Sequence, residues 1–176
     1  PSSTEVNPNE GWRLHFEVTP DLGKTWAITP SLPDPNGLNA IQPSILDHGD
    51  QVLQAVARSK DGGMVDSWSY DNGKTWGEVK SFGLPNPNSG TDAVTVREGF
   101  HLLVYNHSQK PASKWSGPRS PLNVAISADG VQWENILELE NEKGEYSYPA
   151  VVQAEDGLIH ITYTWKRRKI RHVVLD

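Results

Sequence analysis

An eight-residue pattern that occurs twice limits what this chain of 176 residues can fold into. Residues 19–26 (TPDLGKTW) and 69–76 (SYDNGKTW) share one template: a hydroxyl residue, any residue, Asp, any residue, and then Gly-Lys-Thr-Trp. A third copy, at residues 127–133 (SADGVQW), is one residue shorter. The tryptophans that end the three copies are 50 and 57 residues apart, which is the period of a propeller blade and not of a helical repeat.

Each copy has the chemistry of a tight turn between two strands. We expect Asp21, Asp71 and Asp129 to accept backbone N–H groups of the turn, while the glycines supply the positive φ that it needs. The Trp then begins the next strand and packs back over the turn. Because turn chemistry accounts for every position of the template, we interpret these aspartates as structural and not as catalytic.

The segments between the copies have the residue types of short strands separated by turns, and 15 Gly and 13 Pro favour many such segments. First strands are predicted at residues 42–46, 91–96 and 148–152, and second strands at 52–58, 100–106 and 158–164. Third strands are predicted at residues 14–18, 64–69, 122–127 and 170–175, and short fourth strands after Trp26, Trp76 and Trp133.

This order of strands predicts an all-β chain, a β-propeller built from four-stranded blades. Residues 1–176 would form one unit of about three to three and a half blades, half of a six-bladed propeller, with blade parts at 11–30, 38–82, 90–139 and 146–176. Such an arc leaves open sheet edges. We therefore expect either a second copy of the chain, as a homodimer, or a missing N-terminal half to complete the propeller.

Composition excludes several kinds of partner and chemistry. The formal charge of -6 argues against nucleic acid or an anionic membrane as the main partner, and no apolar run approaches the ~20 residues of a membrane helix. The absence of cysteine excludes disulfides, thiolate nucleophiles and Cys-based metal sites. No signal segment follows Pro1, so we expect a mature or trimmed product. The sequence does not fix the cellular compartment of the protein, and a secreted or periplasmic location is favoured.

The three boxes, together with residues 146–149 (YSYP) and 156–165 (DGLIHITYTW), resemble the sialidase (neuraminidase) superfamily. The similarity is closest to the branch of sialidase-like proteins with bacterial neuraminidase repeats, also called Asp boxes. It covers nearly the whole chain, but only the C-terminal half of the family's propeller. The resemblance implies an exo-glycosidase that hydrolyses terminal, anionic sugars from glycans without a cofactor. The boxes are specific for the fold and not for the activity.

The resemblance also implies the chemistry of the site: a Tyr nucleophile activated by a carboxylate, an acid/base Asp, and three arginines that hold the sugar carboxylate. A phenol suits an anionic sugar, which would repel a carboxylate nucleophile. Tyr146 matches the position of the nucleophile, with Tyr148 as an off-by-one rival. Asp92 lies close to where the activating carboxylate is expected. The alternative for Tyr146 is an aromatic residue that packs at the start of a strand.

Two arginines fit the implied role in binding the sugar carboxylate, since Arg forms bidentate, permanently charged hydrogen bonds. Arg58 ends a second strand, and Arg119 lies in the loop before a third strand. Where family sialidases often have a further Arg, this chain has Asn106 and His107. We assign Asn106 to substrate binding and His107 to acid/base catalysis or sugar binding, or else to an ordinary surface loop. The third Arg and the acid/base Asp would come from the missing half.

Two more residues are candidates for contact with a glycan. Trp115 lies in a loop at 110–118 and is placed to stack on a sugar ring, and Arg167 belongs to a basic run at 166–172 (KRRKIRH). That run is either a basic lip that attracts an anionic glycan or a solvated turn between strands. The other five His residues lack metal-ligand spacing, so we predict no catalytic metal. Two alternatives stay open: a non-catalytic carbohydrate-binding or scaffold propeller, and a polysaccharide lyase on the same fold.

Overall fold

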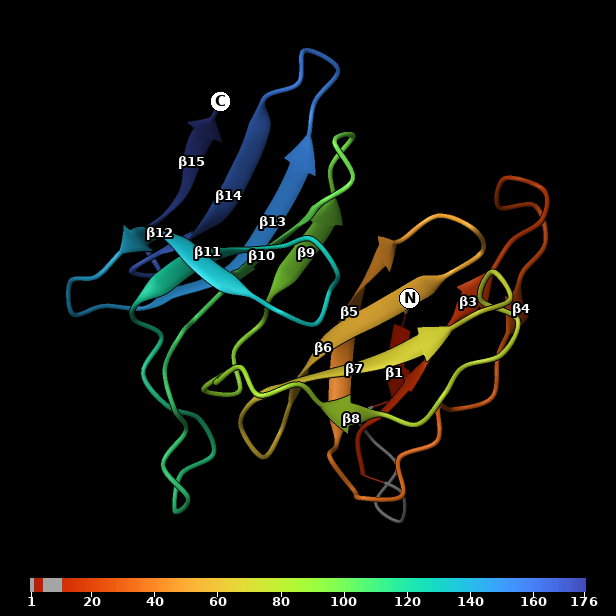
Figure 1. Cartoon of the computed structure of the whole chain (residues 1–176). Coiled ribbons are helices and arrows are strands. Elements are labelled where there is room, and N and C mark those ends of the chain that lie inside the picture. Colours follow the sequence, from red (N-terminus) through yellow and green to blue (C-terminus); the bar gives the residue numbers. More distant parts are fainter. Residues whose placement is uncertain (1, 5–10) are drawn as a thin grey trace.

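A computed structural model describes residues 2–4 and 11–176, and in these ranges the chain forms strands and no helix (Figure 1). The first eight strands are β1 (Ser2–Thr4), β2 (Arg13–His15), β3 (Glu17–Val18), β4 (Ala27–Ile28), β5 (Ala40–Asp47), β6 (Leu53–Ser59), β7 (Met64–Ser69) and β8 (Lys80–Ser81). The others are β9 (Asp92–Thr95), β10 (His101–Tyr105), β11 (Leu122–Ser127), β12 (Glu134–Glu140), β13 (Tyr146–Gln153), β14 (Ile159–Trp165) and β15 (Lys169–Leu175).

The strands pair with their neighbours in the chain to form successive antiparallel sheets. Strands β5 to β8 form one four-stranded sheet, β9 to β12 form a second, and β13 to β15 form a three-stranded sheet, each in chain order. At the N-terminal end, β1 pairs with β2 and β3 pairs with β4. The predicted all-β class with four-stranded blades is thereby confirmed, and the sheets form a partial propeller that does not close.

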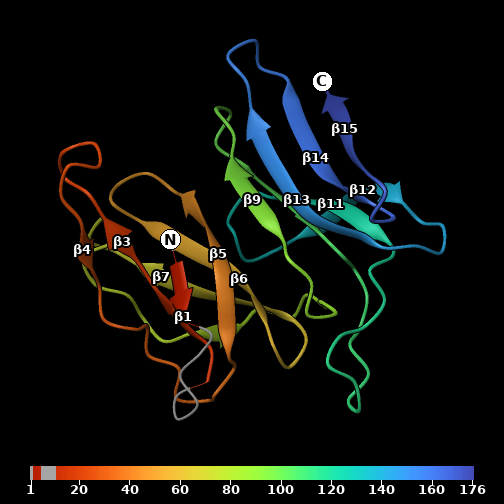
Figure 2. The ribbon, with the colours of Figure 1, turned by 180° about the vertical axis from the view of Figure 1, so that it is seen from behind.

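The inner edge of this arc is made by the first strand of each sheet. Strands β5, β9 and β13 lie side by side in both views (Figure 2), and β9 contacts both of the others. Residues at the start of these strands are therefore brought close together although they are about 50 residues apart in the sequence, the spacing of one blade.

The hydrophobic core lies between consecutive sheets. Because the two four-stranded sheets are covered on both faces, their central strands β6 and β10 are buried almost throughout, without the alternation of a strand that has one face in water. Between these two sheets the core contains Leu46, Val56, Met64, Ala93, Leu103, Tyr105 and Ala125. Between the second and third sheets it includes Val104, Leu122, Val124, Tyr146, Val151, Ile161 and Tyr163.

The three boxes form the turns that their sequences predict. In the second copy, Asp71 accepts the N–H of Thr75 at 2.8 Å and its hydroxyl at 2.6 Å, and Trp76 Nε1 donates to the carbonyl of Gly73 at 3.1 Å. The side-chain and backbone hydrogen bonds from Thr75 lower the pKa of Asp71 to about 2. The first copy repeats these bonds, and in the shorter third copy Asp129 accepts two backbone N–H groups instead.

Several strands differ from the sequence-based expectation. The third strand expected at residues 14–18 is divided into β2 and β3, which pair with β1 and β4 in two separate sheets. The fourth strand β12 has seven residues and is not short, and β8 begins four residues after Trp76 rather than directly after it. Strand β1 pairs with β2 and lies before the first expected blade part at residues 11–30.

Within the described ranges there is no helical segment with the length and apolar character that crossing a membrane requires.

Candidate functional site

Two of the inner strands carry the same irregularity near their start. The pairing of β5 with β6 shifts between Ile41 and Ser44, and that of β13 with β14 shifts between Ser147 and Ala150. Inside these bulges Gln42 and Tyr148, each followed by Pro, have φ values of 57° and 52°. Non-glycine residues with positive φ are uncommon and cluster at functional sites. The bulges leave both side chains exposed on the inner edge of the arc.

The two candidate tyrosines occupy opposite environments. Tyr146 is fully buried in the core between the second and third sheets, where it packs with Ile161 and Tyr163. Tyr148 is 53% exposed, and the guanidinium of Arg119 lies 5.4 Å from the centre of its ring. The Tyr148 side chain is therefore open to solvent, whereas the Tyr146 hydroxyl is enclosed by protein. The difference arises because the bulge reverses the alternation of the strand after Ser147.

A carboxylate next to these tyrosines holds two arginines. Glu145 Oε1 lies 3.1 Å from Arg119 Nη1, and Glu145 Oε2 lies 2.6 Å from Arg167 Nε. Burial alone would raise the pKa of Glu145, but the hydrogen bond from Arg167 and the charges of both arginines outweigh it, and the pKa is lowered. The arginines come from different segments, the loop before β11 and the turn between β14 and β15. Arg119 is thereby placed beside Tyr148, and Arg167, joined to it through Glu145, interacts electrostatically with the Tyr148 hydroxyl.

Arg58 is buried, and its hydrogen bonds brace the neighbouring loops. Its Nε donates to Gln42 Oε1 at 3.1 Å, and its Nη1 donates to the backbone and side-chain oxygens of Asn88 at 2.9 and 2.8 Å. Asn88 in turn donates to the carbonyl oxygen of Trp115. Only 7% of the surface of Arg58 is exposed, so Arg58 holds neighbouring residues of the site in place and offers little surface to a substrate.

Trp12 lies against Arg58, whose guanidinium carbon is 5.5 Å from the centre of its ring, and Trp115 and Lys60 lie next to Trp12. The rings of Trp12 and Trp115 meet edge to face with 5.5 Å between their centres, and Lys60 Nζ lies 5.9 and 5.2 Å from the two rings. Trp12 is buried, but Trp115 is 62% exposed. Because the two rings are perpendicular and Trp12 is buried, it is the exposed Trp115 ring, with the Lys60 cation beside it, that is suited to stacking on a sugar ring.

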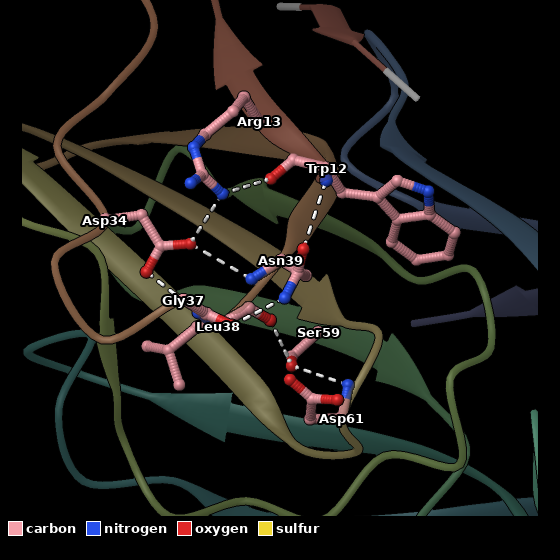
Figure 3. Close-up of polar contacts among 8 residues, drawn as sticks. All are labelled: Trp12, Arg13, Asp34, Gly37, Leu38, Asn39, Ser59 and Asp61. Carbon is pink, nitrogen blue, oxygen red and sulfur yellow. Dashed lines mark hydrogen bonds and ion pairs between the residues drawn. The ribbon is translucent and has the colours of Figure 1, made fainter. Parts of the chain in front are cut away.

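The backbone of Trp12 is fixed by a network of polar contacts, shown in Figure 3. Its N–H donates to Asn39 Oδ1 at 3.1 Å, and the N–H of Asn39 donates to Asp34 Oδ2 at 3.0 Å. Arg13 forms an ion pair with the same Asp34 oxygen at 3.3 Å. Figure 3 shows the Trp12 ring extending away from this network, so the network fixes the backbone that carries the ring.

Asp92 connects the three inner strands. Its Oδ1 accepts the Ser44 hydroxyl of β5 at 2.7 Å, and its Oδ2 accepts the N–H of Val151 of β13 at 2.9 Å. Both oxygens are therefore used in holding neighbouring sheets together. The sequence analysis placed Asp92 close to the expected position of the activating carboxylate. In the structure its contacts hold the neighbouring strands β5 and β13 together.

Asn106 and His107 follow β10 but face different surroundings. Asn106 is fully buried, and its Nδ2 donates to the carbonyls of Pro121 and Tyr146 at 2.9 and 3.0 Å. His107 contacts the Tyr105 hydroxyl and the Asn135 amide, and it lines a cavity of about 270 Å³ beside β12. The structure thus brings Tyr148, Arg119 and Arg167 together, and it places Asn106 in the interior and His107 beside the outer strand.

Sequence reasoning missed several residues of this site, among them Gln42, Glu145 and Gly90, which lies against the Tyr148 ring. A signal for the first was the Pro that follows both Gln42 and Tyr148 in equivalent strands. The part of the chain that the structure describes has no cluster of three or more His, Cys, Asp or Glu side chains able to hold a metal ion.

Comparison with models of known protein families shows which family the chain belongs to. The model of the BNR repeat-like domain matches residues 1–161. This chain belongs to the BNR repeat-like domain family. None of the curated proteins matches it.

Solved sialidase structures share the fold of this BNR repeat-like chain. NanB sialidase from Streptococcus pneumoniae superposes with a TM-score of 0.73 at 16% identity, over 93% of this chain and 27% of its own. The leech intramolecular trans-sialidase gives 0.72 at 13% identity, over 99% and 31%. The intramolecular trans-sialidase from Ruminococcus gnavus gives 0.71 at 17% identity, over 92% and 37%.

These likenesses show a sialidase-like fold and do not by themselves assign an activity, because the identities are low. This BNR repeat-like chain spans only 27 to 37% of the length of the three solved structures.

Proposed function

We propose that this chain contributes the tyrosine side of the active site of a sialidase-like exo-glycosidase, which hydrolyses terminal anionic sugars from glycans. The observation that carries the proposal is the exposed Tyr148 beside Arg119 and Arg167, on the inner edge of a sialidase-like arc. One of the similar structures, the leech enzyme, was solved with 2,7-anhydro-Neu5Ac, an anionic sugar. A second copy of the chain or an N-terminal half completes the propeller in this proposal.

In the proposed reaction Tyr148 is the nucleophile. The Tyr148 hydroxyl gives its proton to a base contributed by the remainder of the propeller, and its oxygen forms a bond to the anomeric carbon while the bond to the leaving oxygen breaks. Water then bonds to the anomeric carbon, the bond to Tyr148 breaks, and the Tyr148 oxygen takes a proton back. Arg119 and Arg167 bind the sugar carboxylate through charged hydrogen bonds. A phenol serves better than a carboxylate here, because a carboxylate would be repelled by the anionic sugar. The acid that protonates the leaving oxygen is contributed by the remainder of the propeller.

The remaining residues position the substrate. Trp115 stacks on the sugar unit next to the scissile bond, with the Lys60 ammonium beside it. Arg58 acts through the groups it binds, since it holds Gln42 and Asn88 in place around the site. His107, on the cavity beside β12, is assigned no step in this mechanism.

A panel of aryl glycosides, offered to the assembly in which a second copy or the N-terminal half completes the propeller, tests the proposal. Aryl sialosides and aryl glucuronides carry a carboxylate, and aryl rhamnosides serve as the neutral control. Release of the aryl group from at least one anionic substrate, and weaker or no release from the neutral one, supports a glycosidase of this class. The proposal is rejected if the panel glycans bind measurably but none is turned over, because a non-catalytic glycan-binding propeller would do just that.

A polysaccharide lyase is the second candidate, and one observation favours it. Both oxygens of Asp92 and both oxygens of Glu145 are engaged by other groups, while the side chains near Tyr148 are cationic or amide groups. In an elimination, an ionised Tyr removes the proton next to a uronate carboxylate that arginines neutralise, a carbon–carbon double bond forms, and the glycosidic bond breaks as an acid of the completed propeller protonates the leaving oxygen. Incubation with uronate polysaccharides distinguishes the two reactions, because a lyase forms an unsaturated product that absorbs ultraviolet light.

A further inference from the structure

The cavity beside β12 lies at the outer edge of the second four-stranded sheet. Strand β12 is the outermost strand of this sheet, on the opposite side from the inner strand β9 (Figure 1). Residues of β11 and β12 line the cavity together with His107 and Pro121. Its volume of about 270 Å³ is close to the lower limit of ligand sites, and it fits one monosaccharide unit. The cavity is therefore separate from the site around Tyr148.

The pairing of β11 with β12 is irregular beside this cavity. Its register shifts on both sides of residues 123–124. Bulges of this kind bend a strand, change the direction of its side chains and are common next to functional sites. Two apolar residues that line the cavity, Ile136 and Leu137, are 50% and 38% exposed. They form an apolar wall that is open to solvent.

Asn123 brings an unpaired amide to the cavity. It is only 4% exposed, it lines the cavity, and its Oδ1 has no hydrogen-bond partner in the part of the chain that the structure describes. Buried polar atoms without a partner are rare in folded proteins, because each costs free energy. Rotation of the planar amide exchanges its oxygen and its nitrogen, so a group that enters the cavity meets an acceptor or a donor. A ligand hydroxyl supplies either kind of partner.

Tyr105 and Asn135 determine which nitrogen of His107 carries the proton. Burial raises the pKa of Tyr105 to about 12, so its hydroxyl stays protonated and donates to Asn135 Oδ1 at 3.0 Å. Asn135 Nδ2 then donates to His107 Nδ1 at 3.0 Å. Because Nδ1 accepts this bond, the neutral imidazole has its proton on Nε2. His107 therefore offers one N–H donor to a ligand in the cavity that it lines.

We infer that this cavity binds one neutral sugar unit, whose hydroxyl groups hydrogen-bond to Asn123 and His107 and whose C–H groups contact the apolar wall. A pyranose has both kinds of group on one ring. Among the described residues, those that line the cavity include the acidic Glu138 and neither Lys nor Arg. The charge of Glu138 disfavours an anionic sugar. The inference goes beyond the proposed function, because it needs neither Tyr148 nor turnover.

Titrations followed by NMR of the ¹⁵N-labelled protein test the inference. The probes are the methyl glycosides of galactose, glucose, mannose and N-acetylglucosamine, with N-acetylneuraminic acid as the anionic comparison. At least one methyl glycoside should bind with a Kd of about 1–10 mM, as expected for a ligand of this size. The largest shifts should occur at the amides of β12 and of His107. N-acetylneuraminic acid should shift these amides with an affinity at least about tenfold lower.

Two pairs of variants show whether the named side chains bind the sugar. Asn123→Leu keeps the approximate shape of the side chain and removes its amide, and Asn141→Leu is the matched control at an exposed residue outside the cavity lining. His107→Phe keeps a ring and removes the donor, with His172→Phe on the third sheet as its control. The Kd should rise at least about fivefold in each cavity variant and stay within about twofold in each control. If Asn123→Leu fails to fold, the partly exposed His107→Phe must show the loss.

Several outcomes overturn the inference. They are the absence of saturable shifts with every methyl glycoside, shifts that centre on Tyr148 instead of β12, an unchanged Kd in both cavity variants, and an equal loss in the controls. The inference and the proposed function fail separately. A protein that binds a methyl glycoside at β12 but hydrolyses no aryl glycoside rejects the glycosidase and supports this site. Hydrolysis of an anionic aryl glycoside without binding at β12 has the opposite meaning.

Discussion

Gly90 lies directly against the ring of Tyr148. A Cβ atom at position 90 would lie 2.8 Å from Cδ1 and 3.1 Å from Cε1 of that ring, and 3.7 Å from Gln42 Oε1. The first of these distances is shorter than real Cβ contacts allow. The absence of a side chain at position 90 therefore makes the room that Tyr148 occupies on the inner edge of the arc.

Gly90→Ala is therefore expected to displace the Tyr148 ring without unfolding the protein. The tyrosine is half exposed and can move, so the free energy of unfolding should change by less than about 1 kcal/mol. Turnover should fall by about tenfold or more, because a displacement of the order of 1 Å at a reacting group strongly lowers the rate of the chemical step. Gly77→Ala is the control, since a Cβ there would lie at an ordinary 3.5 Å from the carbonyl oxygen of Trp68. Equal turnover in the two variants would contradict this account of Gly90.

Asp92 is expected to matter for stability and not for chemistry. Asp92→Ala leaves the N–H of Val151, a buried residue, without its acceptor, which should cost about 1–3 kcal/mol in unfolding free energy. Asp92→Asn keeps one acceptor oxygen and should cost less. Denaturant unfolding measures both. A variant Asp92→Asn that is as stable as wild type but loses turnover more than about a hundredfold would make Asp92 a catalytic carboxylate instead.

A chain of hydrogen bonds connects the first and second four-stranded sheets through two histidines. Thr95 Oγ1 lies 2.9 Å from His101 Nδ1, His101 Nε2 lies 3.2 Å from His48 Nδ1, and His48 Nε2 lies 3.2 Å from Gln54 Oε1. Gln54 donates its own N–H groups to Asp66 and Gly130, so its oxygen must accept. His48 Nε2 then donates to Gln54, His101 Nε2 donates to His48 Nδ1, and the Thr95 hydroxyl donates to His101 Nδ1, so that all donors point one way along these side chains.

This arrangement predicts that acid weakens the fold through His101. Burial and the charge of His48 lower the pKa of His101 from 6.5 to about 4. Because the unfolded state then binds the proton more readily, the free energy of unfolding should fall as the pH drops from 6.5 towards 4, and by about 2 kcal/mol between pH 7 and pH 5. Denaturant unfolding at pH 7 and at pH 5 measures this change in the free energy of unfolding.

Two variants show whether His101 is the group responsible. His101→Gln should remove most of the difference between the two pH values. His160→Gln should leave it unchanged, since His160 contacts His172 at 3.0 Å on the third sheet. A slope that is the same in wild type and His101→Gln would assign the acid sensitivity to other groups.

The fold was predictable because the information lies in local chemistry. The hydroxyl, Asp, Gly and Trp of each box bond to one another within eight residues, as in Asp21 with Thr25 and Trp26 with Gly23. Such contacts need no knowledge of the tertiary structure. Strand β12 was harder to predict, because its exposed residues carry no alternating pattern, and its length is set by pairing with β11.

The site was less predictable because it depends on contacts between distant segments. Alternation along β13 cannot tell which of Tyr146 and Tyr148 faces the interior, since the bulge changes the register between them. Arg58 has the sequence position of a substrate-binding residue, but in the structure it is buried and donates hydrogen bonds to Gln42 and Asn88. The link between Glu145 and Arg119 spans 26 residues and has no local signature.

The account depends most directly on Tyr148. The decisive measurement is kcat/KM on the best anionic aryl glycoside for wild type, Tyr148→Phe and Tyr146→Phe, each checked for folding by thermal unfolding. We predict that Tyr148→Phe loses activity by at least about a thousandfold, and that Tyr146→Phe, whose hydroxyl is buried, stays within about tenfold of wild type. Activity retained in Tyr148→Phe, or lost selectively in a folded Tyr146→Phe, would contradict the central claim.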